Sequence, residues 1–149
     1  MEENNIVVNE TKQYIVIRLG NEQFGIDIKY IDNIVRMQRI TRVPMAQDYF
    51  KGVINLRGEV IPVMSLRVRF ELEDDEIDTK TRIIIVKMDS QSKVGVLVDQ
   101  VKEVVTIESD EVEKVGQSNT ETSAQYLDGV GKNGEELITL LNIANVISD

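Results

Sequence analysis

Two stretches of this chain repeat one residue pattern 77 positions apart, and this repeat constrains the fold more than any other sequence feature. The stretch YFKGVINLRGEVIPVMSL begins at Tyr49, and its counterpart YLDGVGKNGEELITLLNI begins at Tyr126. Each stretch has two apolar-rich runs around a short polar centre, which indicates two strands joined by a tight turn. The chain is therefore expected to contain two similar β-hairpins.

A second pair of matching stretches lies upstream at a spacing of 70 residues. FGIDIKYIDNIV aligns with VGVLVDQVKEVV, which places Gly25 over Gly95 and superimposes the apolar positions. Both matches keep their order along the chain. Chance similarity between strands of like pattern is the alternative, whereas a true repeat predicts two similar small barrels side by side. Two such lobes leave a groove between them, and junctions of this kind are common binding sites.

The remaining segments also have mainly strand patterns. QYIVIRLGNEQFGIDI is expected to form a hairpin, and TRIIIVKM a strand buried on both faces. In KYIDNIVRM the i, i+3, i+4 spacing of apolar residues predicts a short helix, and ANVISD is expected to begin a C-terminal helix. Asn133-Gly134 is compatible with a type I′ turn. With about nine or ten short strands and little helix, the fold class is all-β, as one or two small barrels or a sandwich.

The expected organisation is a flexible N-terminus, residues 1–12, followed by one domain, residues 13–149. The first subdomain covers about 20–80 and the second about 81–147, with the strand 13–19 as a candidate member of the second. The acidic segment FELEDDEIDTK is interpreted as a loop between the two halves. The polar segment 108–125 is unusually long for a connector.

The charge and composition exclude several classes of function. Because 26 acidic residues outweigh 17 basic ones, the formal charge is −9, which disfavours nucleic acid and anionic membranes as partners. Without Cys or His the chain has no disulfide, no zinc site of the usual kind and no histidine base. No apolar run reaches the ~18 residues of a membrane helix, and the acidic start does not resemble a signal peptide. A cytoplasmic protein without a cofactor is therefore expected.

No catalytic constellation emerges from the motifs. The Asp-Thr-Gly or Asp-Ser-Gly tripeptides of a two-lobed aspartic protease do not occur. The glycine-rich stretch GVGKNGEE lacks the Lys-Ser/Thr ending of a phosphate loop, so it is interpreted as a hairpin turn. Nothing points to the paired carboxylates of a glycosidase. A non-enzymatic protein-binding module is the leading hypothesis, and an enzyme or a ligand-binding β protein of the same fold is the alternative.

A single arginine and a cluster of three arginines are candidates for a binding surface. Arg57 occupies the turn of the first repeated hairpin, where the second copy has Gly134, so the hairpin itself does not require an arginine. A further cluster, Arg36, Arg39 and Arg42, is interleaved with apolar residues. The cluster is either a solvated edge, which would protect against self-association, or an electrostatic contact for an acidic partner.

The motifs GNEQFGIDI, ITRVP, FKGVINLRGEVIPVMSLRVRF, VGVLVDQVKEV and YLDGVGKNGEELITLLNI occur in this order. From Gln13 to Ile147 the chain thereby resembles the CheW family, the coupling proteins of bacterial chemotaxis. The resemblance implies two SH3-like five-stranded β-barrels, no enzymatic activity and no cofactor. It also implies two partners, the cytoplasmic tip of chemoreceptors and the regulatory domain of the histidine kinase CheA. A CheW-like scaffold in a non-chemotactic two-component pathway stays open as an alternative.

The resemblance also assigns candidate site residues by position. The receptor-binding groove would contain Ile31, Arg57, Ile83, Gly95, Val98 and Val104. The kinase-binding surface of the first barrel would contain Ile40, Thr41, Arg42 and Gly52. Three positions depart from the usual family pattern: Ser65 stands for Asp, Glu71 for Gly, and Asn33 for the Glu found in some members. Because Asn33 has no charge, a salt bridge from it to Arg57 is not expected.

Overall fold

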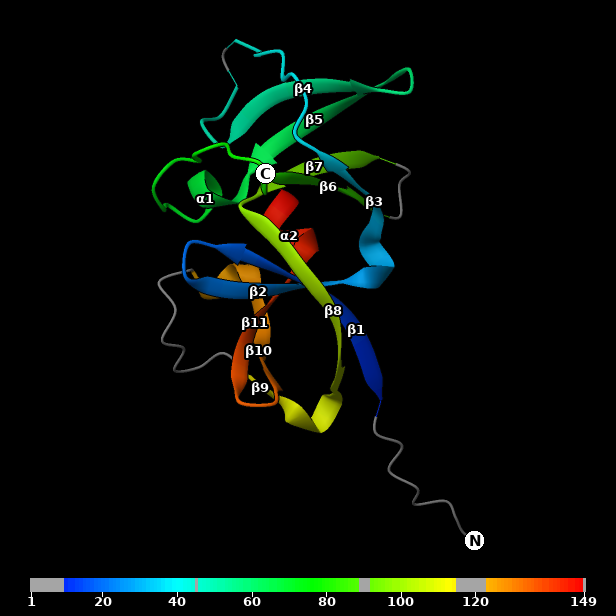
Figure 1. Ribbon diagram of the computed structural model, residues 1–149, viewed down its shortest axis with the longest axis vertical. Helices are drawn as coiled ribbons and strands as arrows, with labels where there is room; N and C mark the ends of the chain where they lie inside the picture. Colours follow the sequence, from blue (N-terminus) through cyan, green and yellow to red (C-terminus); the bar gives the residue numbers. More distant parts are fainter. Residues whose placement is uncertain (1–9, 45, 89–91, 115–122, 149) are drawn as a thin grey trace, which may run out of the picture.

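The computed structural model describes residues 10–44, 46–88, 92–114 and 123–148, and contains two antiparallel-rich sheets, each curled into a small SH3-like barrel (Figure 1). The first barrel contains β3 (Ile31–Arg36), β4 (Phe50–Leu56), β5 (Glu59–Ser65), β6 (Arg82–Lys87) and β7 (Lys93–Val98). The second contains β1 (Thr11–Leu19), β2 (Glu22–Asp27), β8 (Gln100–Glu108), β9 (Val112–Glu113), β10 (Leu127–Asn133) and β11 (Glu136–Leu141). The helical turns are η1 (Ile28–Tyr30), α1 (Leu66–Arg69), η2 (Ser109–Glu111), η3 (Ala124–Tyr126) and α2 (Ile143–Ile147).

The strand register confirms the internal repeat. The first sheet has the order β3-β6-β7-β5-β4, and the second has the equivalent order β8-β1-β2-β11-β10, with β9 added at its edge. In the first barrel Val63 pairs with Gly95 across two parallel strands, and in the second Leu140 pairs with Gly25 in the same way. These four residues are related by the two spacings found in the sequence. The repeat is therefore structural, and chance similarity of strand patterns is excluded.

The sheets divide the chain at other places than the expected subdomain boundaries of 20–80 and 81–147. The hairpin β1–β2 belongs entirely to the second barrel, and the hairpin β6–β7 to the first. Each barrel needs a closing hairpin beside its β5-type strand, and the second barrel takes this hairpin from the N-terminal end of the chain. The second repeat is thus circularly permuted. A boundary drawn by sequence order alone cannot detect such an exchange.

Three apolar clusters hold the structure together. One fills the interior of the first barrel and includes Ile83 and Leu97, and a second fills the interior of the second barrel around Val16 and Ile138. The largest lies between the barrels and combines strands of both sheets with the helices α1 and α2. Figure 1 shows α2 in the middle of the molecule, between the two barrels. Each large apolar side chain buried there stabilises the folded state by about 1.5–3 kcal/mol. The junction is therefore a core rather than a hinge.

The strand β6 confirms the expectation of burial on both faces. Ile83 and Ile85 point into the first barrel, whereas Ile84 and Val86 point into the core between the barrels, and all four are 0% exposed. The continuous apolar run reflects a strand with no solvent face. The C-terminal helix is also confirmed, as α2.

Several local expectations were wrong. The segment predicted as a helix, KYIDNIVRM, forms a single 3-10 turn at Ile28–Tyr30 and then the strand β3, because its β-branched residues pair with β6. The acidic loop at 70–80 lies within the first barrel, since it joins α1 to β6. The expected flexible N-terminus overlaps β1 at residues 11–12, and residues 1–9 lie outside the described residues. Of the polar segment 108–125, the part 109–113 forms η2 and β9, and 115–122 lies outside the described residues.

A partly buried ion pair joins the two barrels at their junction. Arg67 in α1 donates two hydrogen bonds to the Asp99 carboxylate, from Nε at 2.7 Å and from Nη2 at 2.5 Å. The same carboxylate accepts the backbone N–H of Gly20, in the β1–β2 turn of the second barrel, at 2.8 Å. One side chain therefore binds elements of both barrels. Burial acts to raise the pKa of Asp99, but the hydrogen bonds from Arg67 and Gly20 outweigh it and hold the pKa below its ordinary value.

This lowered pKa predicts how stability depends on acid. A carboxyl whose pKa is lower in the folded state stabilises the fold above its unfolded pKa of about 3.9, and loses that contribution as pH falls through the folded pKa. We expect Asp99→Asn to lower the free energy of unfolding by about 1–2 kcal/mol at pH 7, since the pair is only partly solvent-exposed. The difference from wild type should shrink as the pH is lowered below 4. Urea unfolding followed by circular dichroism at pH 7 and pH 3 measures it, and an equal loss at both values would contradict the assignment.

Candidate protein-binding surfaces

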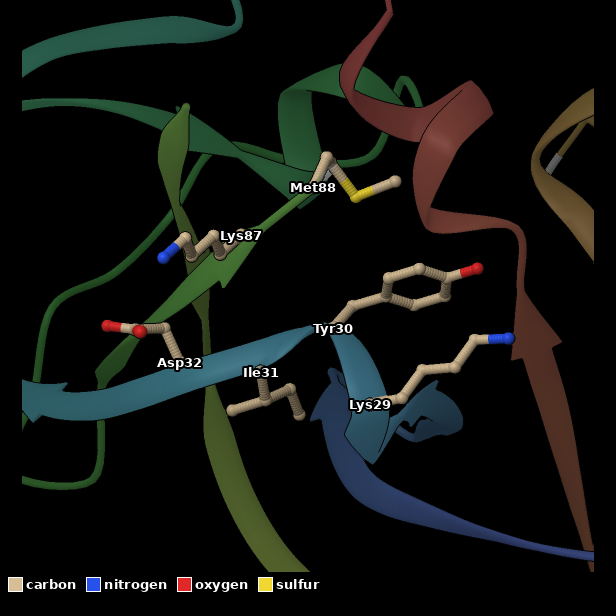
Figure 2. Close-up of a pocket in the computed structure, with 6 residues that line it drawn as sticks. All are labelled: Lys29, Tyr30, Ile31, Asp32, Lys87 and Met88. Carbon is tan, nitrogen blue, oxygen red and sulfur yellow. The ribbon is translucent and has the colours of Figure 1, made fainter. Parts of the chain in front are cut away.

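A groove of about 490 Å³ opens at the barrel junction, beside the segment that passes from the second barrel to the first. It is called the junction groove here, and Figure 2 shows the six residues that line it: Lys29, Tyr30, Ile31, Asp32, Lys87 and Met88. The first four come from η1 and the start of β3, and the last two from the end of β6. Tyr30, Ile31 and Met88 also pack against the core between the barrels, so the apolar part of the groove is the exposed rim of that core.

Charged side chains surround the apolar part of this groove. The Lys29 ammonium lies 5.0 Å from the centre of the Tyr30 ring, a cation–π contact that orients both side chains. Asp32 pairs with Lys93 at 3.5 Å, and Lys93 also pairs with Glu59 at 3.0 Å. These pairs connect β3 to β7 and to the first residue of β5, immediately after the Arg57 turn. The groove thus offers half-buried apolar surface with cations beside it, which suits the binding of a polypeptide segment.

The six residues expected in the receptor groove do not form one surface. Ile31 lines the junction groove, Arg57 is exposed on the β4–β5 turn, and Val104 is 49% exposed on β8. Ile83 and Val98 are 0% exposed, and Gly95 is also buried.

The structure differs from the expected receptor groove at these three positions, because their side chains are buried. Ile83 and Gly95 lie in the interior of the first barrel, and Val98 lies in the core between the barrels. A Cβ atom at Gly95 would come within 2.8 Å of Ile83 Cγ2, so Gly95 is small because the barrel interior leaves no room for a side chain. Their backbones stay close to the junction, but their side chains are not available to a partner.

Arg57 has an unusual backbone conformation for an arginine. Its φ angle is +55°, and that of Gly134, its counterpart in the repeat, is +65°. Gly58 follows with φ +85°, so both central residues of the first turn have positive φ, the pattern of a type I′ turn. The second turn has Gly134 and Glu135 at its centre, and Glu135 does not have positive φ, so the expected type I′ turn at Asn133-Gly134 was wrong and a type II′ pattern is found.

The left-handed backbone of Arg57 is strained. No contact of its side chain with the described residues compensates for this strain. A left-handed conformation costs roughly 1–2 kcal/mol for a residue with a Cβ atom. The Arg57 side chain is exposed and makes no hydrogen bond or ion pair with any residue that the structure describes. Strained residues that persist without a local structural benefit are candidates for function. Among the described residues, a role of the Arg57 side chain in supporting the fold therefore has no support, and a role in contacting a partner is favoured.

We predict that two replacements of Arg57 affect stability differently. Arg57→Gly should raise the free energy of unfolding by about 0.5–1 kcal/mol, because glycine relieves the strain at the expense of a more flexible unfolded chain. Arg57→Ala keeps the strain and should leave stability within about 0.5 kcal/mol of wild type. Urea unfolding tests both variants. A loss of more than about 1 kcal/mol in Arg57→Ala would show that the side chain supports the fold instead.

The residues expected in the kinase-binding surface are brought together by the closure of the first barrel. Thr41 and Val53 exchange two backbone hydrogen bonds of 2.8 Å, which place the segment after β3 against β4. Thr41 and Arg42 are exposed, and Ile40 is half-buried. Gly52 is buried directly beneath them: a Cβ atom there would lie 2.1 Å from the Thr41 carbonyl oxygen. Gly52 therefore shapes this surface from below and does not present a side chain to it.

Two departures from the family pattern have structural explanations. Glu71 has a φ angle of +62°, a conformation that favours the glycine usual at this position. Ser65 caps α1, because its Oγ accepts the backbone N–H of Val68 at 3.1 Å, as an aspartate would. The Ser65 hydroxyl also donates a hydrogen bond to the half-buried Asp75 carboxylate. Burial raises the pKa of Asp75, so a second carboxylate at position 65 would be unfavourable here.

Sequence reasoning missed five of the six residues of the junction groove: Lys29, Tyr30, Asp32, Lys87 and Met88. Tyr30 was visible only as an apolar position of the wrongly predicted helix, and Lys87 and Met88 only as the polar end of a buried strand. These residues meet because β3 and β6 pair, and a single sequence does not reveal that pairing.

The acidic residues of the junction groove and of the η2 turn lie in separate places. The single carboxylate of the junction groove, Asp32, is paired with Lys93, and no second carboxylate lines the groove. Among the described residues, one acidic group has metal-ligand spacing, Glu108, Asp110 and Glu111, and all three are exposed at the η2 turn. Among the same residues, no helix is long and apolar enough to cross a bilayer. Both surfaces are suited to binding.

Comparison with known proteins agrees with this architecture. The family model described as "CheW-like domain" matches residues 13–149. The chain is 31% identical to the chemotaxis protein CheW of Klebsiella aerogenes over 92% of this chain and 82% of that protein. It is 32% identical to CheW of Bacillus subtilis, over 93% and 87% of the two chains. The crystal structure of the scaffolding protein TtCheW from Thermoanaerobacter tengcongensis superimposes with a TM-score of 0.82 at 32% identity, covering 89% of this chain and 90% of that one. The chain therefore belongs to the CheW-like domain family.

Proposed function

We propose that this protein is a non-catalytic adaptor of chemotaxis signal transduction, which acts in the cytoplasm and couples chemoreceptors to the histidine kinase CheA. The observation that carries this proposal is the family match, which spans residues 13–149 and therefore both barrels. It is supported by two separate surfaces, the junction groove and the face around Thr41, and by the lack of a catalytic constellation in the described residues. An adaptor needs at least two such surfaces, since it must bind two partners together.

In this proposal the junction groove receives the helical tip of a receptor. An amphipathic helix presents apolar side chains at i, i+3 and i+4, and an apolar groove reads such a face. Ile31, Tyr30 and Met88 would supply the apolar contacts. One anchor of this kind contributes about 1.5–3 kcal/mol, which supports a weak and reversible contact. Many weak contacts suit a receptor array, where the number of copies supplies the strength.

The kinase regulatory domain would bind the face formed by Ile40, Thr41 and Arg42. This face combines exposed polar groups with a half-buried isoleucine, and the barrel closure at Thr41 and Val53 holds its backbone in place. A pre-formed backbone lowers the entropy lost on binding. Gly52 contributes indirectly, because it allows the segment to lie close to β4.

The proposal is tested by mixing the purified protein with the regulatory domain of a CheA kinase from the same organism, and separately with a receptor cytoplasmic fragment. Analytical ultracentrifugation should detect a complex with each partner, and a ternary complex when all three are present. Absence of any kinase complex at tens of micromolar would contradict the adaptor role. Mutual exclusion of the two partners would also contradict it, because an adaptor must hold both at once.

A further inference from the structure

Three arginines lie close together in a part of this acidic chain that has no acidic residue. Arg36, Arg39 and Arg42 fall between Asp32 and Asp48, and the residues from 33 to 47 include no Asp or Glu, although the whole chain has 26. All three arginines are exposed in the structure. The local charge is therefore opposite to the net charge of −9.

The structure adds a fourth arginine that the sequence does not place there. Arg82, the first residue of β6, lies directly opposite Arg36 in the antiparallel pair β3·β6. Residues opposite each other in such a pair have Cβ atoms about 4.5–5.5 Å apart, and like charges at that spacing destabilise the sheet. Arg82 donates from Nη1 to the carbonyl oxygens of Thr79 and Thr81, both at 2.9 Å. These bonds hold the guanidinium but do not neutralise it.

Among the described residues, five of the thirteen other lysines and arginines form ion pairs with carboxylates. Lys51, Arg67 and Lys93 of the same barrel each form an ion pair. None of the four arginines has an ion pair with a carboxylate in the part of the chain that the structure describes. We call them the arginine patch: Arg36, Arg39, Arg42 and Arg82.

Apolar surface accompanies the arginine patch. Val43, next to Arg42, is 47% exposed, and Ile40 is half-buried with its inner side on the first-barrel core. Arg42 belongs both to the arginine patch and to the proposed kinase-binding face. Arginine with neighbouring apolar side chains is the composition enriched in protein interfaces, because the guanidinium makes forked bonds to carboxylates and is weakly hydrated.

We propose that the arginine patch docks a carboxylate-rich protein surface, and that charge pairing there selects the kinase regulatory domain. The identity of the partner rests on the proposed function. Nucleic acid and anionic lipid fit less well, since both need an extended positive face and the rest of this chain is strongly acidic. A compact acidic surface needs only a local patch, and its attraction is felt over about a Debye length of 8–10 Å.

The first test uses one substitution with opposite effects on stability and binding. Arg36→Glu converts the repulsive pair with Arg82 into an attractive one, so the urea midpoint of unfolding should rise. The same change removes a cation from the patch, so binding of the kinase regulatory domain should weaken by at least about fivefold at 0.05 M salt. A purely structural role for Arg36 would not produce this combination. Stronger binding, or binding equal to wild type, would overturn the proposal.

The second test reverses two charges and includes a matched control. Arg39→Glu with Arg42→Glu should weaken kinase-domain binding at 0.05 M salt by about 10–100-fold and flatten its salt dependence. Lys114→Glu with Lys132→Glu changes the net charge equally, on exposed positions of the second barrel, and should have little effect. Arg39→Gln with Arg42→Gln should give an intermediate loss, and it replaces the reversal if the reversed protein does not fold.

The outcomes separate the inference from the function on which it rests. If the wild-type protein binds the kinase domain equally well at 0.05 M and 0.5 M salt, charge selection is wrong and the adaptor proposal stands. If it does not bind the kinase domain at all, the adaptor proposal fails and the inference fails with it. Arginine-dependent binding to phosphatidylserine vesicles or to duplex DNA at 0.15 M salt would overturn the choice of a protein surface.

Discussion

Gly52→Ala should lower the free energy of unfolding by about 3–5 kcal/mol, the largest single-residue effect that we expect in this protein. The φ angle of Gly52 is +139°, which residues with a Cβ atom rarely adopt. The added carbon would also lie 2.1 Å from the Thr41 carbonyl oxygen and 2.7 Å from its carbonyl carbon. Because both atoms belong to backbone, relief requires breaking the Thr41–Val53 bridge that closes the first barrel.

Gly58→Ala provides the matched control for this prediction. Gly58 also has positive φ, at +85°, but among the described residues nothing beyond its two chain neighbours lies within 4 Å of the position of its added Cβ. This variant should lose only the strain of the turn, about 1–2 kcal/mol. Urea unfolding followed by far-ultraviolet circular dichroism measures both changes. Equal losses in the two variants would show that the contact with Thr41 is unimportant and that only the backbone angle matters.

This prediction changes how Gly52 should be used in binding experiments. A substitution there would disrupt the proposed kinase binding by opening the barrel, even though Gly52 presents no side chain to a partner. Loss of binding in a Gly52 variant is therefore not evidence of direct contact. Thr41 and Arg42, which are exposed, are the positions at which a direct contact can be tested.

Ile31→Asp should weaken binding of a receptor cytoplasmic fragment by about 10–150-fold while the protein stays folded. Ile31 is half-buried on the rim of the core between the barrels and lines the junction groove. The substitution removes an apolar anchor and introduces a charge that a partner's apolar face would have to desolvate. Isothermal titration calorimetry with the receptor fragment measures the affinity, and urea unfolding verifies the fold.

Leu137→Asp is the control for the groove. Leu137 is 59% exposed on β11, outside the residues that line the junction groove, so it carries the same kind of change on another surface. Its receptor affinity should equal that of wild type. If Ile31→Asp unfolds the protein, Ile31→Ala keeps the test possible with a smaller expected loss. Equal affinity of Ile31→Ala and wild type for the receptor fragment would remove Ile31 from the binding surface.

The repeat was predictable from the sequence because hairpins are local structures. The alternation of apolar residues, the turn residues and the fixed spacing between Tyr49 and Tyr126 lie within short segments, and each hairpin forms largely from its own residues. The same reasoning failed where local and distant preferences conflict. The segment beginning at Lys29 has a helical spacing, but pairing of β3 with β6 holds it extended.

The site was less predictable than the fold. Position within a family motif placed Ile83, Gly95 and Val98 in a groove, yet the structure buries all three. A strand in a small barrel has one face inside the barrel and one face toward its neighbour, so apolar residues on it do not reveal which positions remain open. Ile31 is the residue of the predicted set that the structure places in the junction groove.

The amino-acid sequence was sufficient to establish an all-β chain with two related hairpins, no histidine or cysteine chemistry and a resemblance to one family, since these properties depend on residue types and short spacings. Only the tertiary structure assigned the hairpin β1–β2 to the second barrel, placed Arg82 opposite Arg36, and set Gly52 against the Thr41 carbonyl. The physical reason is common to all three. Each depends on contacts between residues far apart in the chain. Those contacts form because the two barrels bury a shared core.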